Sequence, residues 1–149
     1  MATNKQRINA SPHRVFEVLA DGWSYSNWVV GTSHMMAVEP EWPQARSRLF
    51  HATGVWPLTL RDETVVDEVE PDRLLALTAR GWPLGEATIR LELEDDGDGG
   101  CIVTMQEVPT AGSARLMHNK LVDGMLRVRN VESLRRLAGL AERRTAPKR

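Results

Sequence analysis

Residues 119–141 read NKLVDGMLRVRNVESLRRLAGLA, a long pattern typical of an amphipathic helix. Polar Asn119 and Asp123 mark its start, and apolar residues then recur at helical spacing at Leu121, Met125, Val128, Val131, Leu134, Leu137, Ala138 and Ala141. The side expected to face solvent carries Arg127, Glu132, Arg135 and Arg136. We therefore predict one long C-terminal helix whose apolar stripe is buried against another layer of the protein.

Upstream of this helix the hydrophobic period changes to two, which predicts β-strands at about 33–39, 46–53, 58–69, 73–80, 86–94 and 101–108. A further strand at 3–8 precedes a helix that begins at Ser11-Pro12, because serine is a favoured N-cap and proline a favoured first residue. The stretch 23–30 is expected to form a second short helix or turn. The fold class is then α+β, a curved seven-stranded antiparallel sheet wrapped around the C-terminal helix.

Composition narrows the classes of function. With 149 residues the chain is expected to form one domain over 1–144 and a basic tail over 145–149. The net charge of -1 disfavours nucleic-acid partners, and no apolar run approaches the ~20 residues that a membrane span needs. Cys101 is the single cysteine, so neither a disulfide within the chain nor a CxxC motif is possible. The N-terminus lacks a signal-peptide pattern, which predicts a cytoplasmic protein.

Strand pairing can be predicted by centring each hairpin on its turn. This places His34 opposite His51 and Met36 opposite Leu49 on one largely apolar face, together with Leu60, Leu77, Ile89, Leu91 and Met105. The other face collects charged residues, Glu39, Arg46, Arg48, Arg61, Glu63, Arg80, Arg90, Glu92 and Glu94. The apolar residues are candidate ligand contacts in a cavity between the sheet and the helix.

The apolar face also holds four titratable residues, which are the candidates for acid–base chemistry: His34, His51, Asp62 and Glu107. Alternatively, they form satisfied hydrogen bonds within the core, or a β-bulge turns some of them outward. Glu107 fits equally an anchor at a helix end or loop and a carboxylate in the cavity. No HxH or HExxH spacing is present, so we assign no metal and no cofactor.

Methionines and tryptophans complete the predicted site. Met105, Met117 and Met125 are either adaptable core residues or one wall of a pocket that accepts varied apolar shapes. Trp28, Trp56 and Trp82 are candidates for the rim of the opening, where an apolar ring with one N–H donor is useful. Leu121 belongs to the same predicted set of ligand contacts.

Several stretches resemble a known group of proteins: residues 21–34 (DGWSYSNWVVGTSH), 51–58 (HATGVWPL), 85–87 (GEA) and 129–137 (RNVESLRRL). They are similar to the START-like helix-grip superfamily, and within it to the bacterial polyketide cyclase/dehydrase and lipid-transport branch, SRPBCC. The resemblance implies a seven-stranded sheet that grips the C-terminal helix around a deep apolar pocket. Members include lipid carriers, hormone receptors and aromatase/cyclases, so the fold does not determine the reaction.

Three functions stay open at this point. The leading hypothesis is a carrier or sensor of a small hydrophobic or aromatic molecule, because no Ser-His-Asp elbow, P-loop or GxGxxG motif is present. The alternative is a polyketide cyclase or dehydratase in which His51 or His34 is the general base and Asp62 sets its tautomer. The third is an interaction protein that docks through the basic end of the last helix. The oligomeric state is left as monomer or homodimer.

Overall fold

The computed structural model describes residues 1–55, 58–81, 85–111 and 120–145. Its elements are β1 (Ala2–Ile8), α1 (Pro12–Ala20), η1 (Gly22–Ser24), α2 (Tyr25–Trp28), β2 (Thr32–Val38), β3 (Arg48–Val55), β4 (Leu58–Glu70), β5 (Leu74–Gly81), β6 (Gly85–Asp95), β7 (Cys101–Ala111) and α4 (Lys120–Thr145). The strands form one seven-stranded antiparallel sheet in the order β1-β7-β6-β5-β4-β3-β2. The predicted fold class is therefore confirmed.

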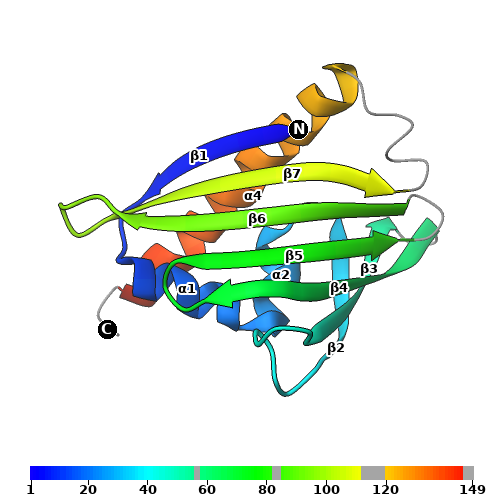
Figure 1. Cartoon of the computed structure of the whole chain (residues 1–149), viewed down its shortest axis with the longest axis horizontal. Coiled ribbons are helices and arrows are strands. Elements are labelled where there is room, and N and C mark those ends of the chain that lie inside the picture. Colours follow the sequence, from blue (N-terminus) through cyan, green and yellow to red (C-terminus); the bar gives the residue numbers. More distant parts are fainter. Residues whose placement is uncertain (56–57, 82–84, 112–119, 146–149) are drawn as a thin grey trace.

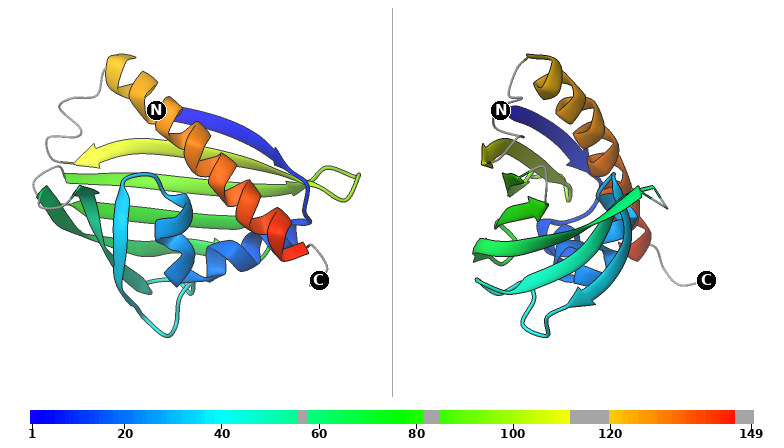
Figure 2. Two further views of the ribbon diagram at one scale, coloured as in Figure 1. Left: turned by 180° about the vertical axis from the view of Figure 1, so that it is seen from behind. Right: turned by 90° about the vertical axis from the view of Figure 1, so that its right-hand side faces the viewer.

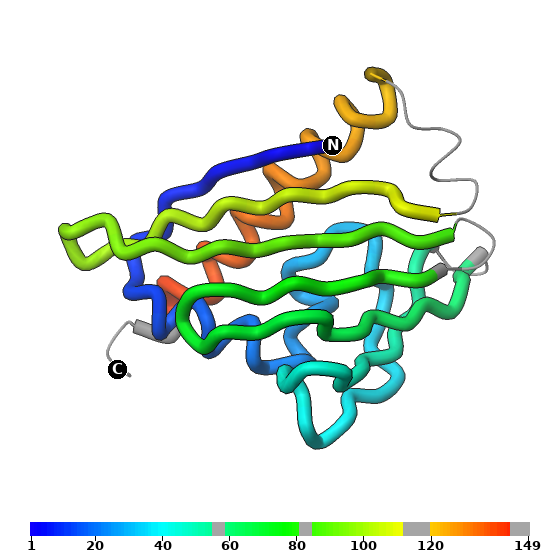
Figure 3. The backbone as a smooth tube through the Cα atoms, in the orientation of Figure 1, coloured from blue at the N-terminus to red at the C-terminus, as the bar shows by residue number. Residues whose placement is uncertain are grey.

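The sheet curves, and α4 crosses its concave side with α1 and α2 beside the later part of the helix (Figures 1 and 2). The β6–β7 hairpin projects beyond one end of the sheet (Figure 3). Helix α1 starts where the sequence predicts, because the Ser11 hydroxyl accepts a hydrogen bond from the Arg14 backbone N–H at 3.3 Å. Along the described residues, no helix combines the length and the hydropathy that a membrane crossing requires.

The two faces of the sheet agree with the predicted alternation although the pairings differ. Centring the hairpins on their turns predicts the pairs Thr53–Leu58 and Ile89–Met105. The structure instead pairs Thr53 with Leu60 and Ile89 with Glu107. A shift of two residues leaves every side chain on its original face, because side chains alternate with a period of two. The outer face carries ion pairs such as Arg48–Glu39, Arg48–Glu63, Arg80–Glu86 and Arg90–Glu92.

Strand β2 departs from the prediction. Its register with β3 shifts between Thr32 and His34 and again between Met35 and Ala37. These β-bulges pair His34 with Ala52, whose other partner Arg61 lies on the outer face. The predicted inner-face positions of His34 and Met36 are wrong, since both side chains are exposed and Met35 pairs with His51 instead.

Helix α4 has a different buried side from the one predicted. Its later residues Leu134, Leu137, Ala138 and Ala141 are buried as expected. The earlier residues of the predicted stripe, Leu121, Met125, Val128 and Val131, are exposed. Successive residues of an α-helix are about 100° apart around its axis. Going back from Leu134, the buried side therefore continues through Ser133 and Asn130, which are both fully buried. Leu121, Met125 and Val128 lie on the opposite side of the helix.

This division of α4 gives a matched stability test. Leu137→Ala removes a side chain of the core cluster and should lower the free energy of unfolding by about 2–5 kcal/mol. Leu121→Ala changes an exposed side chain on the same helix and should stay within about 0.5 kcal/mol of the wild type. Urea unfolding followed by tryptophan fluorescence measures both. Equal losses for the two variants would contradict the observed orientation of the helix.

Candidate ligand-binding site

His51 lies on the concave face of β3, with both ring nitrogens next to protein hydroxyls. Its Nε2 is 3.2 Å from Thr64 Oγ1, and its Nδ1 is 3.4 Å from Thr53 Oγ1. The Thr53 hydroxyl donates a short hydrogen bond to Asp62. These partners assign the proton of the neutral imidazole to Nδ1, which donates to Thr53 while Nε2 accepts from Thr64. Burial lowers the pKa of His51, and the Asp62 carboxylate partly opposes this effect.

Tyr25 packs against this cluster from helix α2. Its ring lies over the imidazole of His51 with a centroid distance of 5.1 Å. Burial raises the pKa of Tyr25 to about 12, against the lowering effects of Thr64 and the Arg129 guanidinium. The phenol is therefore a neutral donor at physiological pH.

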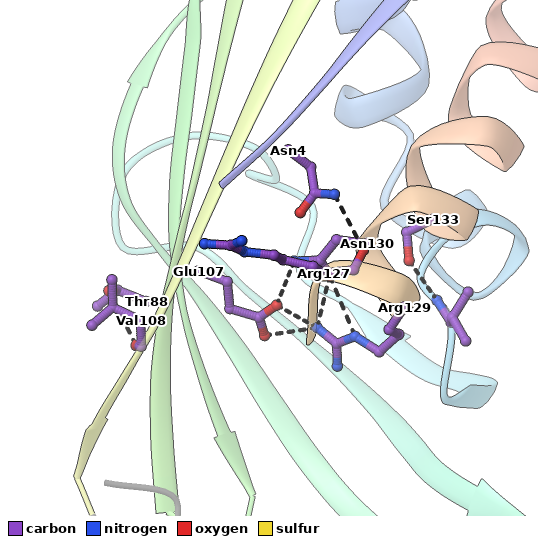
Figure 4. A network of polar contacts seen from close by, with 9 residues as sticks. Asn4, Thr88, Glu107, Val108, Arg127, Arg129, Asn130 and Ser133 are labelled. Atoms are coloured by element: carbon purple, nitrogen blue, oxygen red, sulfur yellow. Dashed lines mark hydrogen bonds and ion pairs between the residues drawn. The ribbon is translucent and has the colours of Figure 1, made fainter. Parts of the chain in front are cut away.

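Glu107 on β7 forms the second polar cluster, with Arg129 and Asn130 of α4 (Figure 4). Arg129 Nη2 donates to both carboxylate oxygens at 2.7 and 2.6 Å, and Asn130 Nδ2 donates to Oε2 at 3.0 Å. The Glu107 side chain is 5% exposed and that of Arg129 is 34% exposed. A buried carboxylate needs such a partner, because removing it from water is costly when it is unpaired.

An open groove of about 710 Å³ runs along the earlier half of α4. Its lining is largely apolar and consists of Val30, Lys120, Leu121, Gly124, Met125, Val128, Arg129 and Glu132. Leu121, Met125 and Val128 are 73%, 65% and 73% exposed, which is unusual for a row of apolar side chains on one helix. Arg129 belongs to both the groove and the Glu107 cluster, so it joins the groove to the concave side of the sheet.

The structure brings some predicted site residues together and separates others. His51 and Asp62 are linked through Thr53, whereas exposed His34 lies on the opposite face of the sheet. On the concave side, the predicted contacts that are buried in the core are Leu49, Leu77, Ile89, Leu91 and Met105. Leu60 shares this face and is 36% exposed. The cavity between sheet and helix stays a prediction, since the groove described above is lined by α4 and Val30.

The tryptophan and methionine predictions have mixed outcomes. Trp28 is buried and packs edge-on against Tyr25 at 5.6 Å, so its predicted place at a rim is wrong. Met125 lines the groove, whereas exposed Met36 lies beside the outer-face residues Phe50 and Arg61. Trp56, Trp82 and Met117 lie outside the described residues. Within the described ranges, no group of three or more His, Cys, Asp or Glu side chains could hold a metal ion.

Sequence reasoning missed Tyr25, Arg129 and Asn130. A signal was present for the pair on α4, because Asn130 and Ser133 interrupt the buried side of a helix where apolar residues are expected. Ser133 accepts a hydrogen bond from the Val30 backbone N–H at 3.1 Å and so ties α4 to the segment between α2 and β2. Tyr25 is the single tyrosine of the chain, and its position in a short helix carried no pattern.

Comparison with known proteins is consistent with this architecture. A family model described as polyketide cyclase/dehydrase and lipid transport matches residues 2–142. Comparison with curated protein sequences finds no match.

Solved structures similar to this one share its fold at low sequence identity. The aromatase/cyclase ZhuI from Streptomyces sp. R1128 is 18% identical with a TM-score of 0.71, over 97% of this chain and 94% of its own. A protein from Mesorhizobium loti is 15% identical with a TM-score of 0.72, over 98% of both chains. Ara h 8.0201 is 13% identical with a TM-score of 0.72, over 95% of this chain and 96% of its own.

The environment of His51 predicts a pH dependence of stability. Because its pKa is lowered in the folded state, the unfolded chain binds the proton first as the pH falls below the ordinary value of about 6.5. The contribution of His51 is therefore fully present above that pH and is lost progressively below it. His51→Gln should show a smaller loss of unfolding free energy between pH 7.5 and pH 5 than the wild type, measured by urea unfolding at each pH.

His34→Gln is the matched control. It makes the same chemical change at a histidine that is exposed on the outer face. We expect its pH dependence to follow that of the wild type, because the exposed His34 side chain lies outside the cluster of His51, Thr53 and Thr64. An unchanged slope in His51→Gln, or an equal change in His34→Gln, would contradict the assignment.

Proposed function

Because the chain belongs to the polyketide cyclase/dehydrase and lipid-transport family of the helix-grip superfamily, we propose that it binds a small hydrophobic or aromatic molecule as a carrier or sensor. Family membership supports a role in hydrophobic-ligand binding or cyclase chemistry. The observation that carries the finer proposal is the groove along α4, where three large apolar side chains stand exposed in one row. Apolar surface of this kind gains free energy when a ligand covers it, by about 25 cal/mol per Å².

The bonding of the titratable groups favours a carrier over an enzyme. A general base needs a lone pair that reaches the substrate, but both nitrogens of His51 face the hydroxyls of Thr53 and Thr64. Glu107 is likewise engaged by Arg129 and Asn130. These groups are satisfied by one another, which suits a rigid polar wall that orients a ligand. Cyclase activity would require them to exchange their partners.

The direct test of the proposal is binding. Native mass spectrometry of gently purified protein should show an apolar adduct, and tryptophan fluorescence should change on titration with lipids or aromatic compounds. A bare mass together with an unchanged fluorescence across the panel would refute the carrier proposal.

A charge placed in the groove should weaken binding without harming the fold. Met125→Glu puts a carboxylate into the apolar row at an exposed helical position, and we expect the Kd of an apolar ligand to rise at least about tenfold. Val131→Glu is the control, because it introduces the same charge at an exposed position of α4 that does not line the groove. Fluorescence titration and urea unfolding are measured for both. Equal weakening by the two variants would place the ligand elsewhere.

A further inference from the structure

The sulfur-containing side chains of the described residues differ widely in their access to solvent. Met105 is 3% exposed and Cys101 is fully buried, and both belong to the core cluster. Met36 is 42% exposed, Met1 is 52% exposed and Met125 is 65% exposed. Met125 is therefore a highly exposed thioether, and it lies in the apolar row that lines the groove.

The buried sulfur atoms do not compete with Met125 for an oxidant. Burial raises the pKa of the Cys101 thiol to about 11, so the reactive thiolate is scarce at physiological pH. Oxidation of Met105 in β7 requires local opening of the core, which is a rare event in a stable domain. Among these residues, an oxidant in solution therefore reaches Met125 first.

The position of Met125 in the row makes its polarity important. Leu121 precedes it by four residues and Val128 follows it by three, spacings that place all three side chains on one face of α4. The first turns of α4 reach past β1, beyond the edge of the sheet (Figure 1). A polar group at the middle position divides the apolar row into two separate side chains, whereas a polar group at either end only shortens it.

A thioether reacts with a hydroperoxide without help from other residues. The sulfur lone pair attacks the terminal peroxide oxygen, the O–O bond breaks, and an S–O bond forms. The proton of the attacked oxygen passes to the departing oxygen, which leaves as water or as an alcohol. The sulfur is oxidised by two electrons and the peroxide is reduced by two, so the step needs no other reactant.

We propose that Met125 is a reversible oxidation site through which hydroperoxides regulate ligand binding in the groove. The inference rests on the proposed binding function, because the affected surface is the same. Oxidation replaces an apolar thioether by a sulfoxide, whose oxygen is a strong hydrogen-bond acceptor. An apolar ligand that covers the groove has to displace water from that oxygen and offers no hydrogen bond in return. Oxidation thus weakens binding, and enzymatic reduction of the sulfoxide restores it.

Site-resolved oxidation of the full chain tests the accessibility of Met125. The protein is treated with hydrogen peroxide, and the sulfoxide fraction of each methionine is followed over time in tryptic peptides by mass spectrometry. Trypsin releases Met125 in residues 121–127, LVDGMLR, apart from the other methionines. We expect Met125 to oxidise at least about tenfold faster than Met105, whose oxidation waits for local opening. Equal rates would overturn the proposal.

Binding is measured on the same samples with N-phenyl-1-naphthylamine, a neutral apolar probe whose fluorescence rises away from water. We expect its Kd to increase at least about tenfold once Met125 is largely sulfoxide. Treatment with the two methionine sulfoxide reductases, which between them reduce both epimers, should return the Kd to its initial value. An unchanged Kd after full oxidation of Met125 would refute the regulation and leave the binding function standing.

Met125→Leu keeps the row apolar and has no sulfur to oxidise. Each protein is compared with itself before and after peroxide, so the starting affinity of the variant does not enter the result. We expect the effect of peroxide to disappear in Met125→Leu and to persist in Met36→Leu, the control at an exposed methionine outside the groove. If Met125→Leu loses as much affinity as the wild type, another residue is responsible and the proposal is overturned.

Met125→Gln imitates the sulfoxide without any peroxide, because its neutral amide places an acceptor oxygen in the same row. We expect its Kd for the probe to be at least about tenfold above that of Met125→Leu. The position is exposed, so both variants should unfold at the urea midpoint of the wild type. Equal Kd values for the two variants would overturn the regulation. If the untreated wild type does not bind the probe, the proposed function fails for ligands of this size and the regulation fails with it.

Discussion

A carboxylate that is buried between a sheet and a helix determines where the helix can lie. Glu107 must be paired, and its partners Arg129 and Asn130 are neighbours on α4, so the three residues fix that turn of the helix against β7. Before this turn the contacts of α4 with β1 are polar as well, such as the bond from Asn4 Nδ2 to the Arg127 carbonyl. Polar bonds thus tie this half of α4 to β1, and its apolar residues Leu121, Met125 and Val128 line the groove.

The alternation of faces could be predicted from sequence, and the exact pairing could not. Polar and apolar residues report which face a side chain occupies, and a two-residue error in pairing, as at Thr53 and Leu60, leaves that information intact. Bulges in β2 do change the face, because each adds one residue to one strand. The alternation of polar and apolar residues over 33–38 gives no sign of these bulges. His34 therefore lies outside the predicted site, whereas His51 and Asp62 lie within it.

The polar chemistry was harder to predict because it joins residues that are distant in sequence. Thr64, His51, Thr53 and Asp62 form one chain of hydrogen bonds across β3 and β4. Sequence patterns describe local periodicity, and they identified His51 and Asp62 as inner-face residues. They do not show that threonine hydroxyls satisfy both nitrogens of the histidine. That detail separates an available base from a structural residue, and it depends on distances of a few tenths of an ångström.

The bulges of β2 have a consequence for the protein in a crowded solution. In the strand order β2 is one of the two edges of the sheet. A straight edge strand offers a regular row of backbone N–H and C=O groups to which a strand from another molecule can add. Two interruptions within Thr32–Val38 break that row into short pieces. The same irregularity that moves His34 out of the interior thus protects the molecule against edge-to-edge aggregation, and straightening the strand would remove the protection.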